Sequence, residues 1–192
     1  GWYEGPAVDV ARNAFTVECW FRMPGPIRQP NRERSLLAVS ASPPGQAATA
    51  TAAGWHVWTR PGLLGFRLGG PERAPVYSST GPRNDTWHYL AVTWDGREVR
   101  MYLDGQMVNR QEYGAGEVAA DGHSTMRLGY PGGSPVVLDV DEIAIYARAL
   151  SADEGETASR DHEAEFWQAL FRRADACLDA GDFKGARSEY AA

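Results

Sequence analysis

The stretch from Trp87 to Gly105 alternates apolar and polar side chains on both sides of Asp95-Gly96. The apolar set is Leu90, Val92 and Trp94 before this pair and Val99, Met101 and Leu103 after it. A period of two residues indicates a strand with one buried face, and an Asp-Gly pair between two such runs is typical of a tight hairpin. The pattern therefore predicts an antiparallel hairpin that packs against a second layer.

Similar runs, separated by clusters of Gly, Pro, Asn and Asp, occur along most of the chain. They predict eleven strands. These are Ala7–Val10, Phe15–Arg22, Ser35–Ser40, Trp55–Arg60, Gly65–Leu68, Val76–Ser79, Trp87–Asp95, Glu98–Leu103, Gln106–Arg110, Met126–Gly129 and Val136–Tyr146.

Three segments in this order resemble one family of domains. The hairpin sequence WHYLAVTWDGREVRMYLDG, the segment FTVECWFR at Phe15–Arg22 and the segment VDEIAIYARALSADE at Val140–Glu154 are similar to the laminin-G-like (concanavalin A-like) jelly rolls. The resemblance implies a mainly β fold, a two-sheet antiparallel jelly-roll sandwich. It does not imply one function, because this fold serves lectins, adhesion modules, pentraxins and glucanases.

The last part of the chain has a different pattern. Ser151 and Glu154 form a capping box that predicts the start of a helix, and apolar residues then recur at helical spacing. The segment around Gly181-Asp182-Phe183 resembles the middle of a tetratricopeptide repeat. We therefore expect a sandwich over residues 1–155 and a C-terminal α-helical extension over 156–192, a helical hairpin that could begin a repeat region.

Charge separates the same two parts and excludes some partners. Residues 151–192 hold ten of the 25 acids and five of the 19 bases, which leaves the sandwich nearly neutral within a net charge of −6. This balance argues against nucleic acid and anionic membranes. No apolar run is long enough to span a membrane. Only one of the 19 basic residues is lysine, and the rest are arginine. This bias toward arginine favours a bacterial source.

The segment Trp2–Gly5 resembles only the end of the family's opening strand. We therefore expect this chain to be a piece of a longer protein, with any signal peptide outside the sequence. The expected location is extracellular or the cell envelope.

A catalytic function would require acids at alternating positions of the strand Val136–Tyr146. Some glucanases of the superfamily carry three acids at alternating positions of one strand, which suits retaining hydrolysis. Here Asp139 and Asp141 are predicted to share a face with Ile143, whereas Glu142 points the other way. No Glu occupies the nucleophile position, so we expect no enzyme activity.

Metal binding has one candidate. Pentraxins place an acidic calcium loop where this chain has residues 130–135, a segment without a carboxylate. Calcium prefers six to eight oxygen ligands, several of them charged. No cofactor is expected; a calcium site built from Asp139 or Asp141 with loop carbonyls is the alternative.

A ligand surface is predicted on the strand GWHVWTR. If Trp55 and Val57 face the core, then His56, Trp58 and Arg60 present an aromatic ring between two hydrogen-bonding side chains on the opposite face. Tyr130 is a further candidate contact.

These observations favour a non-catalytic binding or adhesion module with a glycan or protein ligand. The alternative is a structural subunit that self-assembles through its helical tail and open first strand. A glycoside hydrolase ranks third. Saturable binding by a monomer distinguishes the first class, whereas a large self-associated species without ligand distinguishes the second.

Overall fold

The computed structural model describes residues 3–7, 14–25, 34–40, 54–60, 62–68, 74–113, 125–129 and 137–151, with single positions at 153, 154, 157, 168, 171 and 172. Eleven strands are defined within these residues. They are β1 (Tyr3–Ala7), β2 (Phe15–Arg22), β3 (Arg34–Ser40), β4 (Gly54–Arg60), β5 (Leu63–Leu68), β6 (Val76–Tyr77), β7 (His88–Trp94), β8 (Glu98–Leu103), β9 (Gln106–Glu112), β10 (Thr125–Leu128) and β11 (Asp139–Tyr146).

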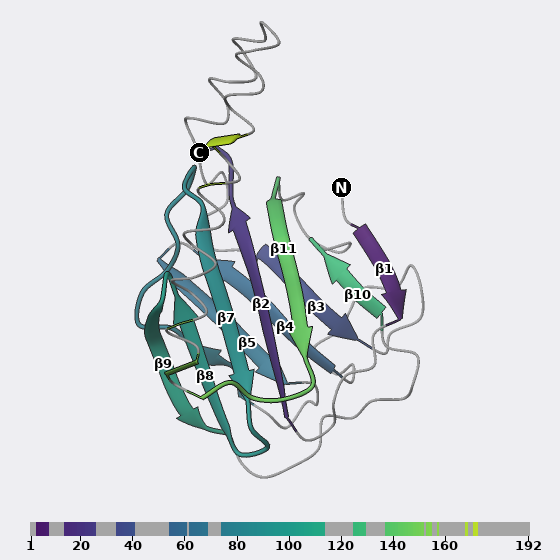
Figure 1. Ribbon diagram of the computed structural model, residues 1–192, viewed down its shortest axis with the longest axis vertical. Coiled ribbons are helices and arrows are strands. Elements are labelled where there is room, and N and C mark those ends of the chain that lie inside the picture. The colour runs from purple at the N-terminus through teal and green to yellow at the C-terminus, as the bar shows by residue number, and fades with distance from the viewer. Residues whose placement is uncertain are drawn as a thin grey trace, which may run out of the picture.

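The strands form two antiparallel sheets that pack face to face (Figure 1). The six-stranded sheet has the order β1-β10-β3-β4-β5-β6, and the five-stranded sheet has the order β11-β2-β7-β8-β9. In Figure 1 the five-stranded sheet lies in front of the six-stranded sheet. The mainly β, two-layer sandwich predicted from the alternation is therefore confirmed.

The β7–β8 hairpin has the predicted register. Leu90 pairs with Leu103 and Trp94 pairs with Val99, and the apolar members of both strands are buried in the central core. Val92 and Met101 are both completely buried. Every second side chain enters the core because the strand period is two residues, so the alternation specified the buried face.

The first strand differs from the prediction. β1 is Tyr3–Ala7 and shares only Ala7 with the predicted Ala7–Val10, whose remaining residues lie outside the described part of the chain. Pro6 has no backbone N–H and usually argues against a strand. Here β1 is the edge strand beside β10, and its pairing shifts register between Glu4 and Ala7, an arrangement that accommodates proline.

The predicted facing of β11 is wrong beyond Asp141. The pairing of β11 with β2 shifts register between Asp141 and Ala144, and Glu142 has a φ of 50°. An extra residue in the strand reverses the alternation that follows. Asp139 and Asp141 pair with Arg22 and Trp20 of β2, whereas Ile143 packs against the core and does not share their face.

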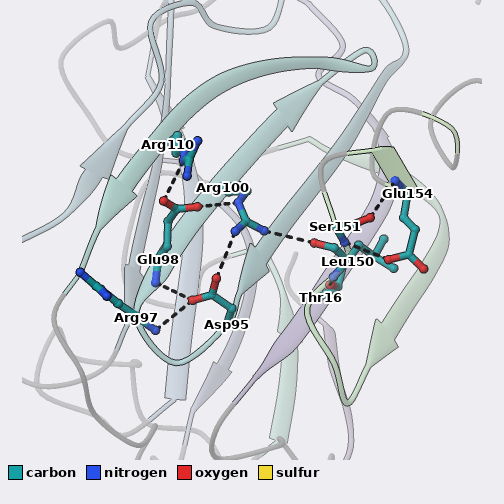
Figure 2. A network of polar contacts seen from close by, with 9 residues as sticks. All are labelled: Thr16, Asp95, Arg97, Glu98, Arg100, Arg110, Leu150, Ser151 and Glu154. Atoms are coloured by element: carbon teal, nitrogen blue, oxygen red, sulfur yellow. Dashed lines mark hydrogen bonds and ion pairs between the residues drawn. The ribbon is translucent and has the colours of Figure 1, made fainter.

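The segment after β11 is attached to the outer face of the five-stranded sheet (Figure 2). The Thr16 hydroxyl donates to the Arg148 carbonyl at 2.9 Å and accepts from the Leu150 amide at 3.0 Å. Arg100 Nη1 donates to the Leu150 carbonyl at 3.4 Å. Arg100 in turn pairs with Asp95 and Glu98 at the end of the β7–β8 hairpin.

The predicted capping box is present. The Glu154 amide donates to Ser151 Oγ at 3.2 Å, and the Ser151 amide donates to Glu154 Oε2 at 2.9 Å. The backbone hydrogen bond from Ser151 and the pairing with Arg148 lower the pKa of Glu154 to about 2.

The predicted helical hairpin over 156–192 falls almost entirely outside the described residues, so it and the proposed domain division stay predictions. Among the positions that are described, no helix has the length and apolar character needed to cross a membrane.

Candidate functional site

The predicted ligand surface lies on β4, in the middle of the six-stranded sheet. Trp55 and Val57 point into the core, where their exposed fractions are 2% and 0%. Because side chains alternate along a strand, His56, Trp58 and Arg60 lie on the opposite, outer face. The condition on which this surface was predicted is therefore met.

The Trp58 ring is the floor of this surface and is not an exposed platform. It is only 1% exposed. Its ring lies over Gly65, the residue opposite it on β5, and a β-carbon placed on Gly65 would be 2.3 Å from a ring carbon. Glycine at position 65 is therefore required for the ring to occupy this place.

Two side chains from neighbouring strands enclose the same ring. The Arg67 guanidinium carbon lies 5.3 Å from the Trp58 ring centroid, a cation–π distance. The Tyr77 ring meets Trp58 edge-on, with centroids 6.2 Å apart, and remains 38% exposed. Neither residue was among the predicted site residues, because each comes from another strand.

His56 is neutral at pH 7. Burial, together with the nearby positive charge of Arg67, lowers its pKa to about 4. Its Nε2 is 2.9 Å from Ser35 Oγ, and its ring centroid lies 5.0 Å from that of Trp58. His56 therefore acts here as a hydrogen-bonding group, and the positive charge of the surface comes from arginine.

Two buried hydrogen-bond donors on this surface have no partner in the described part of the chain. They are Nε1 of Trp58 and Nε of Arg67. No carboxylate among the described residues pairs with Arg67. Buried polar groups without a partner are costly, so these atoms are candidates for contact with a ligand.

The remaining predicted site residues do not join this surface. Tyr130 lies outside the described residues. Asp139 pairs with Arg22 at 2.9 Å, and Asp141 Oδ1 accepts the Glu142 amide at 3.0 Å. Among the described residues, no group of three or more His, Cys, Asp or Glu side chains is arranged to ligate a metal ion. Calcium binding at Asp139 or Asp141 stays a prediction.

An Asp–His pair that sequence reasoning missed has a structural role. His88 Nδ1 lies 2.7 Å from Asp104 Oδ2, and its Nε2 accepts the Arg83 amide at 2.8 Å. The backbone bond occupies the nitrogen that a general base would use. Asp104 is sixteen residues away in the next turn, and no local motif in the sequence indicates this pairing.

A buried acid lies on the outer face of the five-stranded sheet. Glu18 is 2% exposed and accepts hydroxyl hydrogen bonds from Tyr89 at 2.5 Å and from Tyr146 at 2.6 Å. Burial and the hydrogen bond to Glu18 raise the pKa of Tyr89, and the separate hydrogen bond from Tyr146 to Glu18 raises the pKa of Tyr146 to about 12. A cavity of about 420 Å³ adjoins Glu18 and Tyr146.

Similar folds occur in proteins that bind glycans or proteins. The Ruminococcus gnavus IT-sialidase CBM40 bound to α2,3 sialyllactose matches with a TM-score of 0.61 and 16% identity, over 78% of this chain and 84% of that one. The botulinum neurotoxin serotype D ligand binding domain in complex with N-acetylneuraminic acid matches with a TM-score of 0.60 and 16% identity, over 78% of this chain and 36% of that one. The binding domain of botulinum neurotoxin DC in complex with rat synaptotagmin II matches with a TM-score of 0.58 and 10% identity, over 78% of this chain and 36% of that one.

These likenesses show the fold alone. The chain spans little more than a third of the length of the botulinum neurotoxin binding domains that it matches. A search of curated proteins found no match.

The family assignment comes from the sequence. The profile of the concanavalin A-like lectin/glucanases superfamily matches residues 2–154, a range that includes all eleven strands of the two sheets. The chain belongs to this superfamily.

Proposed function

We propose that this chain is a non-catalytic binding module and that its ligand is a glycan. The ligand contacts the outer face of the six-stranded sheet at His56, Trp58 and Arg60. Arg67 and Tyr77 complete this surface, which we call the β4 face. Tyr130 is retained as a further contact from the sequence.

The observation that carries the proposal is the set of donors without partners in the described part of the β4 face. Trp58 Nε1 and Arg67 Nε are buried beside the exposed ring of Tyr77. Sugar-binding surfaces need an aromatic ring for the apolar face of the sugar and fixed donors for its hydroxyl groups. The β4 face supplies both within a rigid sheet.

The comparisons support a binding role in general terms. Structures with the same fold were solved with sialyllactose, with N-acetylneuraminic acid and with synaptotagmin II. A glycan is favoured over a protein ligand for this chain because the β4 face is small and lies on side chains of three adjacent strands. Domains of this kind commonly act outside the cell, and we place this module in an extracellular or cell-envelope protein.

The polar groups of the five-stranded sheet favour a non-catalytic role. Asp139 is paired with Arg22, His88 is occupied at both nitrogens, and Glu18 is bonded to two tyrosines. Catalytic acids act through a group that can reach the substrate.

A glycan screen followed by titration calorimetry tests the proposal. Tyr77→Ala removes the exposed ring and should weaken binding of any glycan found by at least tenfold. Met107→Ala removes a similarly exposed apolar side chain from β9 on the other sheet and should not change binding. Equal loss in both variants would refute a glycan-binding β4 face, and a large ligand-free assembly in sedimentation without any glycan bound would favour the self-assembling subunit instead.

A further inference from the structure

The two sheets carry opposite charge. The strands of the six-stranded sheet contain four bases and one acid, namely Arg34, Arg60, Arg67 and Arg127, and Glu4. The strands of the five-stranded sheet contain six acids and three bases, namely Glu18, Glu98, Glu112, Asp139, Asp141 and Glu142, and Arg22, Arg100 and Arg110. The six-stranded sheet is thus net cationic within a chain whose net charge is −6. Such asymmetry attracts an anion to one face.

Arg67 also differs in its pairing from the arginines of the five-stranded sheet. On the five-stranded sheet, Arg22 pairs with Asp139, and Arg100 and Arg110 pair with Glu98. On the β4 face, Arg67 has no carboxylate partner among the described residues, and its Nε is buried without a hydrogen bond there. The only acid on a strand of this sheet, Glu4, is on β1 at the far edge.

The geometry around Arg67 suits a carboxylate on a small ligand. His56 is directly opposite Arg67 in the register of β4 and β5, and Trp58 lies beneath the guanidinium group. A guanidinium group is planar and bonds a carboxylate with two parallel hydrogen bonds. From His56 to Arg60 the strand extends about 13 Å, so the β4 face is a compact surface and lacks the length of a nucleic-acid track.

We propose that the β4 face recognises an acidic sugar, whose carboxylate binds Arg67 and whose ring lies against Tyr77. This inference rests on the proposed function and specifies the ligand class. Trp58 supports the guanidinium group of Arg67 from below, and Arg60 lies at the other end of the surface.

The test compares three trisaccharide or disaccharide probes that share a lactose core. Sialyllactose carries a carboxylate, lactose carries no charge, and 3′-sulfated lactose carries a tetrahedral anion. Titration calorimetry should show sialyllactose binding at least tenfold more tightly than either of the others. Equal affinity for lactose would overturn the acidic-sugar inference and leave a glycan-binding β4 face intact. Tighter binding of the sulfated sugar than of sialyllactose would overturn the inference that the recognised group is a carboxylate.

Matched variants locate the charge. Arg67→Gln should lose about 10- to 100-fold of the affinity for sialyllactose, the usual effect of removing a charged hydrogen bond. It should change lactose binding little. Arg97→Gln makes the same substitution at a side chain that is 73% exposed on the β7–β8 turn of the other sheet, and should have no effect. Equal losses in both variants would show nonspecific charge attraction and overturn the inference.

Histidine NMR gives a readout that misfolding cannot mimic. The groups facing His56 are Ser35 on β3 and Arg67 on β5, with Trp58 and Arg60 on its own strand. A bound carboxylate next to Arg67 offsets that positive charge, so sialyllactose should raise the pKa of His56 whereas lactose should not. An unchanged His56 pKa at saturating sialyllactose would place the ligand elsewhere and refute both the acidic-sugar inference and the proposed β4 face.

Discussion

The outer faces of the two sheets contain similar residue types but differ in how these residues are bonded. On the five-stranded sheet, Glu18 accepts bonds from Tyr89 and Tyr146, and Thr16 bonds the segment after β11 twice. On the six-stranded sheet, the charged Arg67 and the adjacent Trp58 contain buried donors without partners in the described residues, whereas on the other outer face the uncharged hydroxyl of Thr93 is also without one. Internally bonded polar groups stabilise a particular fold, whereas donors without partners are suited to recognition.

The largest expected effect tests the internally bonded polar groups of the five-stranded sheet. Glu18→Ala leaves the hydroxyls of Tyr89 and Tyr146 without their acceptor, and we expect a loss of about 3–4 kcal/mol in the free energy of unfolding. Urea unfolding measures it. Glu112→Ala, whose side chain is 69% exposed, should cost less than about 0.5 kcal/mol. Near-equal losses would mean that the buried acid does not stabilise the fold.

The next effect concerns the floor of the β4 face. Gly65→Ala places a methyl group where the Trp58 ring lies, and the forced repacking should cost about 2 kcal/mol and abolish ligand binding. Thermal and urea unfolding measure the cost. In a Trp58→Leu background the same substitution should cost almost nothing, because the clash is gone. A cost that is equal in both backgrounds would show that the ring is not the cause.

Acid should destabilise the fold through His56. Its folded pKa is about 4 against an ordinary value of 6.5, so the unfolded chain binds more protons between these values. Stability is therefore full above pH 6.5 and falls as the pH drops toward 4. For this half-buried group we expect a loss of about 1–2 kcal/mol by pH 5. His56→Gln should flatten this part of the profile; an unchanged slope would assign the effect to another group.

The smallest expected effect is at the bulge of β11. Glu142 has a φ of 50°, a conformation that glycine adopts without strain. Glu142→Gly should therefore raise the free energy of unfolding by about 0.5–1 kcal/mol. Glu142→Ala retains the strained backbone and removes the side chain, so it separates the two contributions. If both variants are equally stable, the backbone strain is not the source of the change.

The parts of the fold that depend on local pattern were predictable from the sequence. The β7–β8 hairpin follows from alternation around Asp95-Gly96, and the inward direction of Trp55 and Val57 follows from the same period. The bulge near Glu142 was missed, because a strict period of two was continued through it, although the apolar positions change from Leu138 and Val140 to Ile143 and Ile145. The prediction that Ile143 shares a face with Asp139 and Asp141 was consequently wrong.

The candidate site was predictable only as far as a single strand. The sequence pattern placed His56, Trp58 and Arg60 on one face, but it could not show that Trp58 is covered. The cover depends on Gly65, Arg67 and Tyr77, whose positions follow from the order of β4, β5 and β6. The charge difference between the sheets likewise requires knowledge of which strands pair.

The attachment of the segment after β11 determines how the domain carries mechanical load. Within the described residues β11 is an edge strand that pairs only with β2, and tension applied to its end alone would peel it away one hydrogen bond at a time. The Thr16 hydroxyl joins Arg148 and Leu150 directly to β2, and Arg100 joins Leu150 to β8. Tension arriving through the residues beyond Ser151 is therefore shared with β2 and β8, two interior strands of the sheet.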